Sequence, residues 1–165
     1  MSLQRCGACI TTRPLLRGIF LRRCLVAEIN KDKIEVYAGE IKEAVRLLRD
    51  CTKVLREKFL QDDTLIRSTK YNFVVAGQAA IDICYHIVAK KGGRAPKDYA
   101  HCFELLDELN ILPKETVRKM ADMAKFRNLL VHHYIKVDNK RVYEKLKDID
   151  VFLEFLEKLG ETLLP

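Results

Sequence analysis

Residues 31–60 read KDKIEVYAGEIKEAVRLLRDCTKVLREKFL, and their apolar positions recur with a helical period. Two interleaved series repeat every seven residues: Ile34, Ile41, Leu48 and Leu55, and Ala38, Val45, Thr52 and Phe59. A narrow apolar seam of this kind is typical of a helix in a bundle. The pattern therefore predicts one long amphipathic helix over residues 31–60.

Four further helical stretches follow, with apolar faces over residues 73–88, 99–109, 113–134 and 142–159. The first of these takes Asp63 or Thr64 as its N-cap and stops at the glycine pair 92–93. Pro113 suits the first turn of the third. No segment shows the alternation of a β-strand. We therefore predict an all-α, up-and-down bundle of four or five helices.

The composition is that of a single globular domain. The chain has 165 residues, of which 48% are hydrophobic and 32% charged, so it can bury one core. It contains no run of eighteen apolar residues, so we expect no membrane-spanning segment. Three cysteines lie one per predicted helix, at Cys51, Cys84 and Cys102. We expect these to be buried free thiols in a reducing cytoplasm.

Residues 1–27 differ from the rest of the chain. They contain no acidic residue, and their arginines contribute +5 of the net charge of +7, which leaves +2 for the remaining residues. A targeting presequence, a zinc half-site at Cys6 and Cys9, and an over-extended start with true initiation near Val26 are the three interpretations. We favour the over-extended start. A near-neutral domain also weakens the charge argument for nucleic-acid binding.

The stretch KFRNLLVHHY, residues 125–134, gathers an arginine, two histidines and a tyrosine at the end of the fourth helix. It is either an ordinary basic helix end or a site that handles phosphate, to which arginine and histidine are suited. On a regular helix Tyr134 lies about 20° from Arg127, whereas His132 lies about 140° from it. We therefore expect the helix to loosen at His132, Arg127 to curl round, or a second element to complete the site.

Other polar residues are candidates for the same site. Asn128 is spaced i,i+4 from His132, so it can orient the imidazole or cap a loop. Asp82 and His86 share this spacing on the second helix, where they form either a proton relay or ordinary packing contacts. His133 is expected to be exposed.

Two side chains on the second helix, Gln78 and Tyr71, are further candidates for lining a cleft, and their spacing does not decide the matter. Outside residues 6–24, no group of Cys, His and Asp has the spacing of metal ligands. We expect no metal and no cofactor.

Arg-x4-His-x-Tyr, with asparagine directly after the arginine, resembles the RX4HXY motif of HepT-type toxins in the HEPN superfamily. Residues 95–146 are similar to that family throughout, including the ILP turn and the exit VDNKRVYEKL. The similarity covers about residues 30–160. We therefore divide the chain into an N-terminal extension, 1–27, and a HepT-like HEPN domain, 28–165.

The resemblance implies an all-α HEPN bundle that forms a homodimer, with the two motifs facing a cleft between protomers. It further implies a cytoplasmic, metal-independent endoribonuclease toxin that cleaves RNA by attack of the 2′-hydroxyl. The catalytic residues would be Arg127, His132 and Tyr134, supported by Asn128 and Asp82. The implied partner is a MntA-type minimal nucleotidyltransferase antitoxin, which inactivates the toxin by AMPylation of Tyr134.

A second hypothesis is a HEPN module without catalytic activity, which binds nucleotide or protein as the partner of a nucleotidyltransferase. The near-neutral domain suits this alternative, because a nuclease surface would be expected to carry a basic stripe.

Overall fold

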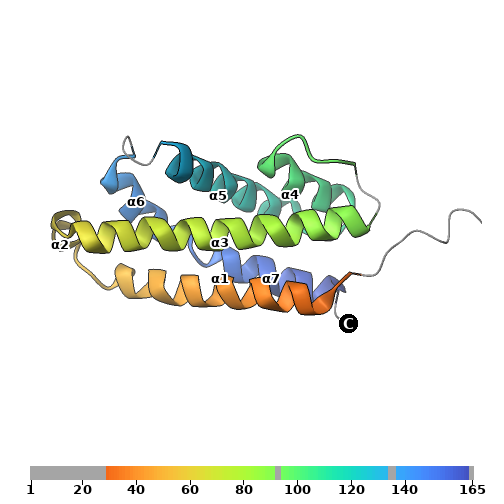
Figure 1. Cartoon of the computed structure of the whole chain (residues 1–165), viewed down its shortest axis with the longest axis horizontal. Coiled ribbons are helices and arrows are strands. Elements are labelled where there is room, and N and C mark those ends of the chain that lie inside the picture. The colour runs from red at the N-terminus through yellow and green to blue at the C-terminus, as the bar shows by residue number, and fades with distance from the viewer. Residues whose placement is uncertain (1–28, 92–93, 134–136, 164–165) are drawn as a thin grey trace, which may run out of the picture.

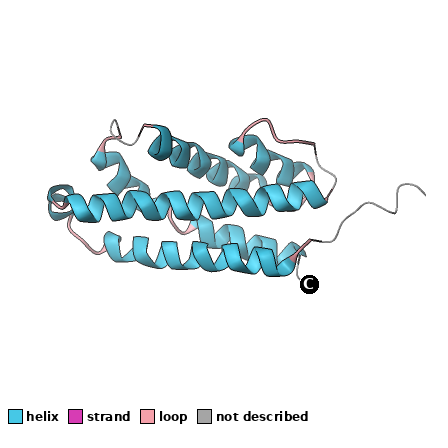
Figure 2. Ribbon diagram, viewed as in Figure 1, coloured by secondary structure: helices cyan, strands magenta, loops and turns pink. Residues whose placement is uncertain are grey.

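The computed structural model describes residues 29–91, 94–133 and 137–163, and within these ranges it contains helices and no strand (Figure 2). The elements are α1 Lys31–Thr52, α2 Arg56–Gln61, α3 Asp63–Lys90, α4 Tyr99–Glu108, α5 Lys114–His132, α6 Asn139–Lys145, the 3-10 turn η1 Leu146–Asp148, and α7 Val151–Leu163. The prediction of an all-α bundle is confirmed.

The long helix α3 runs through the middle of the bundle (Figure 1). It contacts α1 on one side and α4 and α5 on another, while α7 contacts both α1 and α5. Buried residues from all of these helices form one continuous core. The core therefore surrounds α3, which accounts for the long row of buried apolar residues in this helix.

The start of α3 is set by Asp62, whose carboxylate accepts a hydrogen bond from the backbone N–H of Leu65 at 2.9 Å. The N-cap thus lies one residue before the predicted position. By length and hydropathy, α3 alone among the described helices could cross a membrane, and 61% of its most apolar 18-residue stretch is buried in the bundle. Packing against neighbouring helices accounts for its apolar character.

The single helix predicted over residues 31–60 is wrong, because a turn separates α1 from α2. Leu55, which the seam placed inside, is 64% exposed. The backbone carbonyl of Val54, freed by the turn, accepts a hydrogen bond from the Tyr143 hydroxyl at 2.9 Å. The turn also brings Phe59 into the core, where its ring packs against that of Tyr143 with centroids 5.1 Å apart.

The predicted fifth helix is also divided, since α6 and η1 end before α7 begins. Helix α6 contacts α2 and α3, and η1 contacts α1, whereas α7 contacts α1 and α5. The turn therefore lets the two parts of one apolar pattern face different neighbours. No glycine or proline marks this turn, which is why the sequence pattern reads as continuous.

The helix α5 runs antiparallel to α3 (Figure 1). Phe126 of α5 packs edge-on against Phe73 of α3, with ring centroids 5.2 Å apart. The cysteines Cys51, Cys84 and Cys102 are buried and unpaired, as predicted. The pairing of α3 with α5 sets the position of the motif described next.

Candidate active site

Arg127 projects from α5 toward α3 and α4, and its guanidinium is held by three groups. It donates hydrogen bonds to the side-chain oxygens of Asn128, at 3.0 Å, and of Gln78 on α3. It also lies over the ring of Tyr99 on α4, 5.4 Å from the centroid, in a cation–π contact. The guanidinium is therefore fixed by side chains from three helices.

The contacts of Arg127 leave part of its hydrogen-bonding capacity unused. A guanidinium has five N–H donors, and the bonds to Asn128 and Gln78 use one on each terminal nitrogen. The Nε–H is buried and has no partner in the described part of the chain. One N–H on each terminal nitrogen also has no partner among these contacts, and a guanidinium with free donors can bind a phosphate group.

Gln78 links Arg127 to Asp82. The amide oxygen of Gln78 accepts from Arg127, and its amide nitrogen donates to the Asp82 carboxylate at 2.9 Å. Because an amide has one accepting and one donating end, these two bonds define its orientation. All three side chains are half-buried, so the chain of bonds lies partly out of water.

The proton relay suggested for Asp82 and His86 is not formed. The Nε2 of His86 instead accepts a hydrogen bond from the backbone N–H of Asn30 at 3.0 Å, at the start of α1. Burial, with a smaller effect of the ammonium groups of Lys33 and Lys90, lowers the pKa of His86. The neutral ring is the form that can accept this hydrogen bond. His86 therefore serves the fold, whereas Asp82 is joined to Arg127 through Gln78.

Gly77 allows α5 to approach α3 at Arg127. A Cβ atom at position 77 would lie 2.9 Å from the Cβ of Arg127 and 3.0 Å from its Cγ. Such distances are shorter than van der Waals contact, and the atoms concerned are close to the backbone of α5. Only glycine fits here without displacing the arginine.

Gly77→Ala is therefore expected to lower the free energy of unfolding by about 1–2 kcal/mol, because the cost of overpacking exceeds the gain in helix propensity. Gly39→Ala on α1 is the matched control, since nothing lies within 4 Å of a Cβ there. It should raise stability by about 0.5–1 kcal/mol. Urea denaturation of both variants measures the two effects, and equal signs would contradict the close contact.

His132 is the last residue of α5 and is exposed. Helix α5 continues as far as His132 and ends there, so no loosening, one of the three possibilities, is seen between Arg127 and His132. Arg127 and His132 therefore lie on different sides of the helix, about 140° apart. Within the described ranges, no hydrogen bond joins His132 to Arg127.

Tyr134 lies outside the described residues, so the prediction for this side chain stays a prediction. His133 caps the end of α5 and is exposed, as predicted. Asn128 bonds to Arg127, which is a different contact from the expected one with His132.

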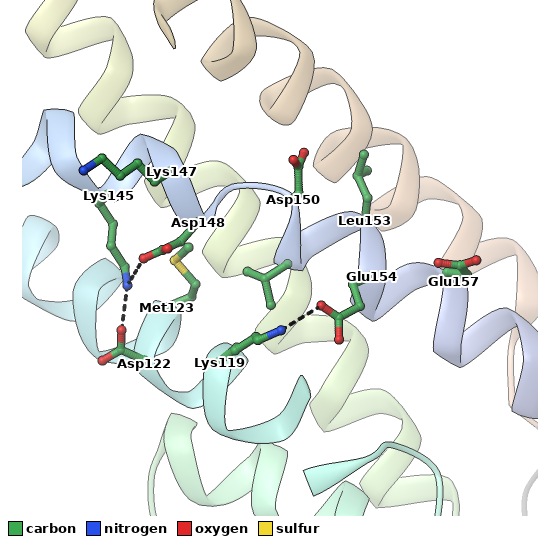
Figure 3. A pocket seen from close by; sticks show the side chains of 11 residues that line it. Lys119, Asp122, Met123, Lys145, Lys147, Asp148, Asp150, Leu153, Glu154 and Glu157 are labelled. Carbon is green, nitrogen blue, oxygen red and sulfur yellow. Dashed lines mark hydrogen bonds and ion pairs between the residues drawn. The ribbon is translucent and has the colours of Figure 1, made fainter. Parts of the chain in front are cut away.

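One hollow in the surface is lined by none of the motif residues. It has a volume of about 700 Å³, and residues of α5, α6, η1 and α7 line it (Figure 3). Two of its three lysines are paired with carboxylates: Lys145 lies 2.6 Å from Asp122 and 2.9 Å from Asp148, and Lys119 lies 3.3 Å from Glu154. Five carboxylates and three lysines line it in total. This surface is unsuited to a polyanion.

Two site residues, Gly77 and Tyr99, were not foreseen from the sequence, and Gln78 was left undecided. Gln78 and Asp82 are spaced i,i+4, which is the one local signal for their bond. The contacts of Gly77 and Tyr99 with Arg127 join different helices, so no local pattern reports them. In the ranges that the structure describes, no three His, Cys, Asp or Glu side chains are grouped as metal ligands.

Comparison with known proteins gives both a family and a fold. A family model described as "Ribonuclease HepT-like" matches residues 41–159. A protein of Archaeoglobus fulgidus named "Putative RNase" is 31% identical over 94 residues, which are 56% of this chain and 70% of that protein.

Several solved structures with the same fold are toxin–antitoxin complexes. One, a toxin–antitoxin with AMP-PNP, has a chain that aligns with a TM-score of 0.73 and 23% identity, over 79% of this chain and 98% of that one. Another is a tri-AMPylated HEPN toxin of Shewanella oneidensis in complex with its MNT antitoxin, with a TM-score of 0.72, 24% identity and the same coverage. These matches show the HEPN fold. Together with the family model, they establish that the chain belongs to the HepT-like ribonuclease family.

Proposed function

We propose that this protein is the toxin of a toxin–antitoxin pair and a metal-independent endoribonuclease that acts on cytoplasmic RNA. The observation that carries the proposal is the guanidinium of Arg127, which Gln78, Asn128 and Tyr99 hold in place with an N–H free on each terminal nitrogen. A prearranged donor pair of this kind suits the oxygens of a phosphodiester. Membership of a ribonuclease family supports RNA as the substrate.

The proposed reaction needs one proton acceptor and one proton donor. A neutral His132 removes the proton from the ribose 2′-hydroxyl, whose oxygen attacks the adjacent phosphorus and forms a P–O bond. A protonated His132 gives its proton to the 5′-oxygen as the P–O5′ bond breaks. The products are a 2′,3′-cyclic phosphate and a 5′-hydroxyl, and no water or oxidant is consumed. Arg127 stabilises the charge on the phosphorane oxygens, and Tyr134 hydrogen-bonds the phosphate.

We propose a symmetric homodimer as the active form. One His132 cannot be both acid and base in a single step, whereas two protomers supply one of each. The angle of about 140° between Arg127 and His132 on a regular helix also favours a site completed by a second chain. The cleft would then contain both motifs.

The proposed partner is a minimal nucleotidyltransferase of the MntA type. The support is the shared fold with toxins whose solved complexes contain such an antitoxin, one of them with the toxin AMPylated. Transfer of AMP from ATP to the Tyr134 hydroxyl would form a phosphodiester and release pyrophosphate. This step would regulate the nuclease.

The test of the proposed function is cleavage of a total RNA preparation by the protein purified without its partner. We expect fragments with 2′,3′-cyclic phosphate and 5′-hydroxyl ends, in equal yield with and without EDTA, because imidazole and guanidinium groups carry the proposed chemistry. Intact RNA after incubation with the dimeric protein would favour the non-catalytic binding module. Loss of cleavage in EDTA would contradict the metal-independent mechanism.

A further inference from the structure

The face of α3 that contacts Arg127 continues toward the start of the helix as an exposed polar stripe. At 100° per residue, the directions of Arg67 and Tyr71 lie within about 20° of that of Gln78. Tyr71 is 68% exposed, the largest exposure among the large hydrophobic and aromatic residues of the described ranges. Arg67 is also exposed, and Lys70 beside it is half-exposed. We call Arg67, Lys70 and Tyr71 the α3 stripe.

The α3 stripe extends from Gln78 in the same direction along the bundle as the motif extends from Arg127. Because α5 runs antiparallel to α3 (Figure 1), the residues that follow Arg127 advance toward the start of α3. His132 lies about 7.5 Å beyond Arg127 along α5, and Tyr71 lies about 10 Å from Gln78 along α3 in the same direction. The α3 stripe therefore lies on the side of Arg127 toward which the motif extends.

The charge of the α3 stripe is uncompensated. Neither Arg67 nor Lys70 forms an ion pair with a carboxylate of the described residues, although ten such pairs occur elsewhere in them. Burial, and after it the positive charge of Arg67, lowers the pKa of Lys70. Two cations close together, neither of them paired with a carboxylate, favour an anionic ligand.

An exposed aromatic ring beside unpaired cations has the composition of a surface that binds single-stranded nucleic acid. Bases stack on such rings without regard to sequence, while the cations contact phosphates. A second copy of the chain is a poorer occupant, because a two-fold axis through Tyr71 would bring Arg67 and Lys70 close to their own copies. The exposed ring beside two cations therefore favours single-stranded nucleic acid over a second copy of the chain as the occupant of this surface.

We propose that the α3 stripe is a binding subsite for single-stranded RNA, in which Tyr71 stacks on a base next to the cleaved phosphodiester and Arg67 and Lys70 contact its phosphates. The inference rests on the proposed function, since it extends the substrate away from Arg127. The inference also explains how a nearly neutral domain could bind a polyanion, because Arg67 and Lys70 lie on the same side of the bundle as Arg127 and a short segment of RNA could contact all three.

The test measures binding separately from cleavage. A fluorescein-labelled 12-nucleotide 2′-O-methyl oligouridylate cannot be cleaved by 2′-hydroxyl attack, so its fluorescence anisotropy reports binding to the full-length protein alone. Tyr71→Ala should weaken binding roughly 5- to 150-fold, and Tyr71→Phe should restore it. Arg67→Gln should reduce the slope of log affinity against log salt by about 0.7.

Matched controls lie on α1. Val36→Ala removes another exposed apolar side chain, 65% exposed, and Lys42→Gln removes another exposed cation. Both should leave affinity within about twofold after the general effect of one charge is considered. Equal losses in the control and stripe variants would overturn the proposal, as would a wild-type protein that does not bind the oligonucleotide.

Two further outcomes separate this inference from the proposed function. If the wild type cleaves RNA while Tyr71→Ala leaves both affinity and KM unchanged, the nuclease assignment stands and the subsite is refuted. If Tyr71→Ala instead shifts the sedimentation coefficient to that of a monomer with affinity unchanged, the stripe is a contact between protomers and the proposal is wrong. A raised KM with kcat unchanged supports the subsite.

Discussion

His132→Ala is expected to lower the rate of RNA cleavage by about 10²–10⁴-fold, because it removes the group that accepts and donates the proton. Arg127→Ala should produce a loss of the same order, since the phosphorane oxygens lose their fixed cation. Single-turnover cleavage of a labelled RNA measures both. The melting temperature of His132→Ala should stay close to that of the wild type, because the side chain is exposed at the end of α5.

The chain offers a matched control for each change. His133 is the adjacent exposed histidine, and Arg118 is an exposed arginine on the same helix. His133→Ala and Arg118→Ala should retain cleavage within a few-fold. If His132→Ala cleaves as fast as the wild type, or if His133→Ala loses as much, the assignment of the acid–base residue is incorrect.

Co-expression with the partner nucleotidyltransferase is expected to abolish cleavage by attaching AMP to Tyr134. The adduct would place a phosphodiester, with one negative charge, near Arg127, where it would occupy the phosphate-binding position and repel RNA. Intact-mass spectrometry should show one or more AMP units on the wild type, and peptide mapping should place them on Tyr134. The modification should switch the protein off without unfolding it.

Tyr134→Phe separates modification from the presence of the partner. This variant lacks the hydroxyl, so it should carry no adduct and should keep its cleavage activity when the partner is present, apart from the loss of one hydrogen bond to phosphate. Tyr143→Phe is the control, because that hydroxyl is already bonded to the carbonyl of Val54. An equal adduct on Tyr134→Phe, or an unmodified wild type, would refute the mechanism.

The helical fold could be predicted because its signals are local. The apolar period of α1 and α3 and the position of Pro113 each depend on residues close in sequence. The turn between α1 and α2 could not be predicted from this period, because it is stabilised by Tyr143, which follows 89 positions after Val54. The division between η1 and α7 also involves a residue distant in sequence, because Asp150 in this turn accepts hydrogen bonds from Arg49.

The candidate site shows the same difference. Arg127 and His132 are close in the sequence, so the motif could be found from the sequence alone. The i,i+4 spacing of Asp82 and His86 also made Asp82 a candidate. Its expected partner was His86, whereas the structure shows Gln78, because His86 is used at the start of α1. Asp82 binds Gln78 and not His86 because Gln78 faces Arg127 of α5 and His86 faces the start of α1. These contacts join different helices, so the local spacing does not report them.

The amide of Gln78 separates the guanidinium of Arg127 from the carboxylate of Asp82. A carboxylate in direct contact with Arg127 would form an ion pair that an incoming phosphodiester would have to break, and the competition between two anions would weaken substrate capture. With Gln78 between them, Asp82 orients the arginine through an amide dipole and stays out of direct contact with it. Gln78 thus holds the guanidinium in place, while the positive charge of Arg127 is not neutralised by direct contact with a carboxylate.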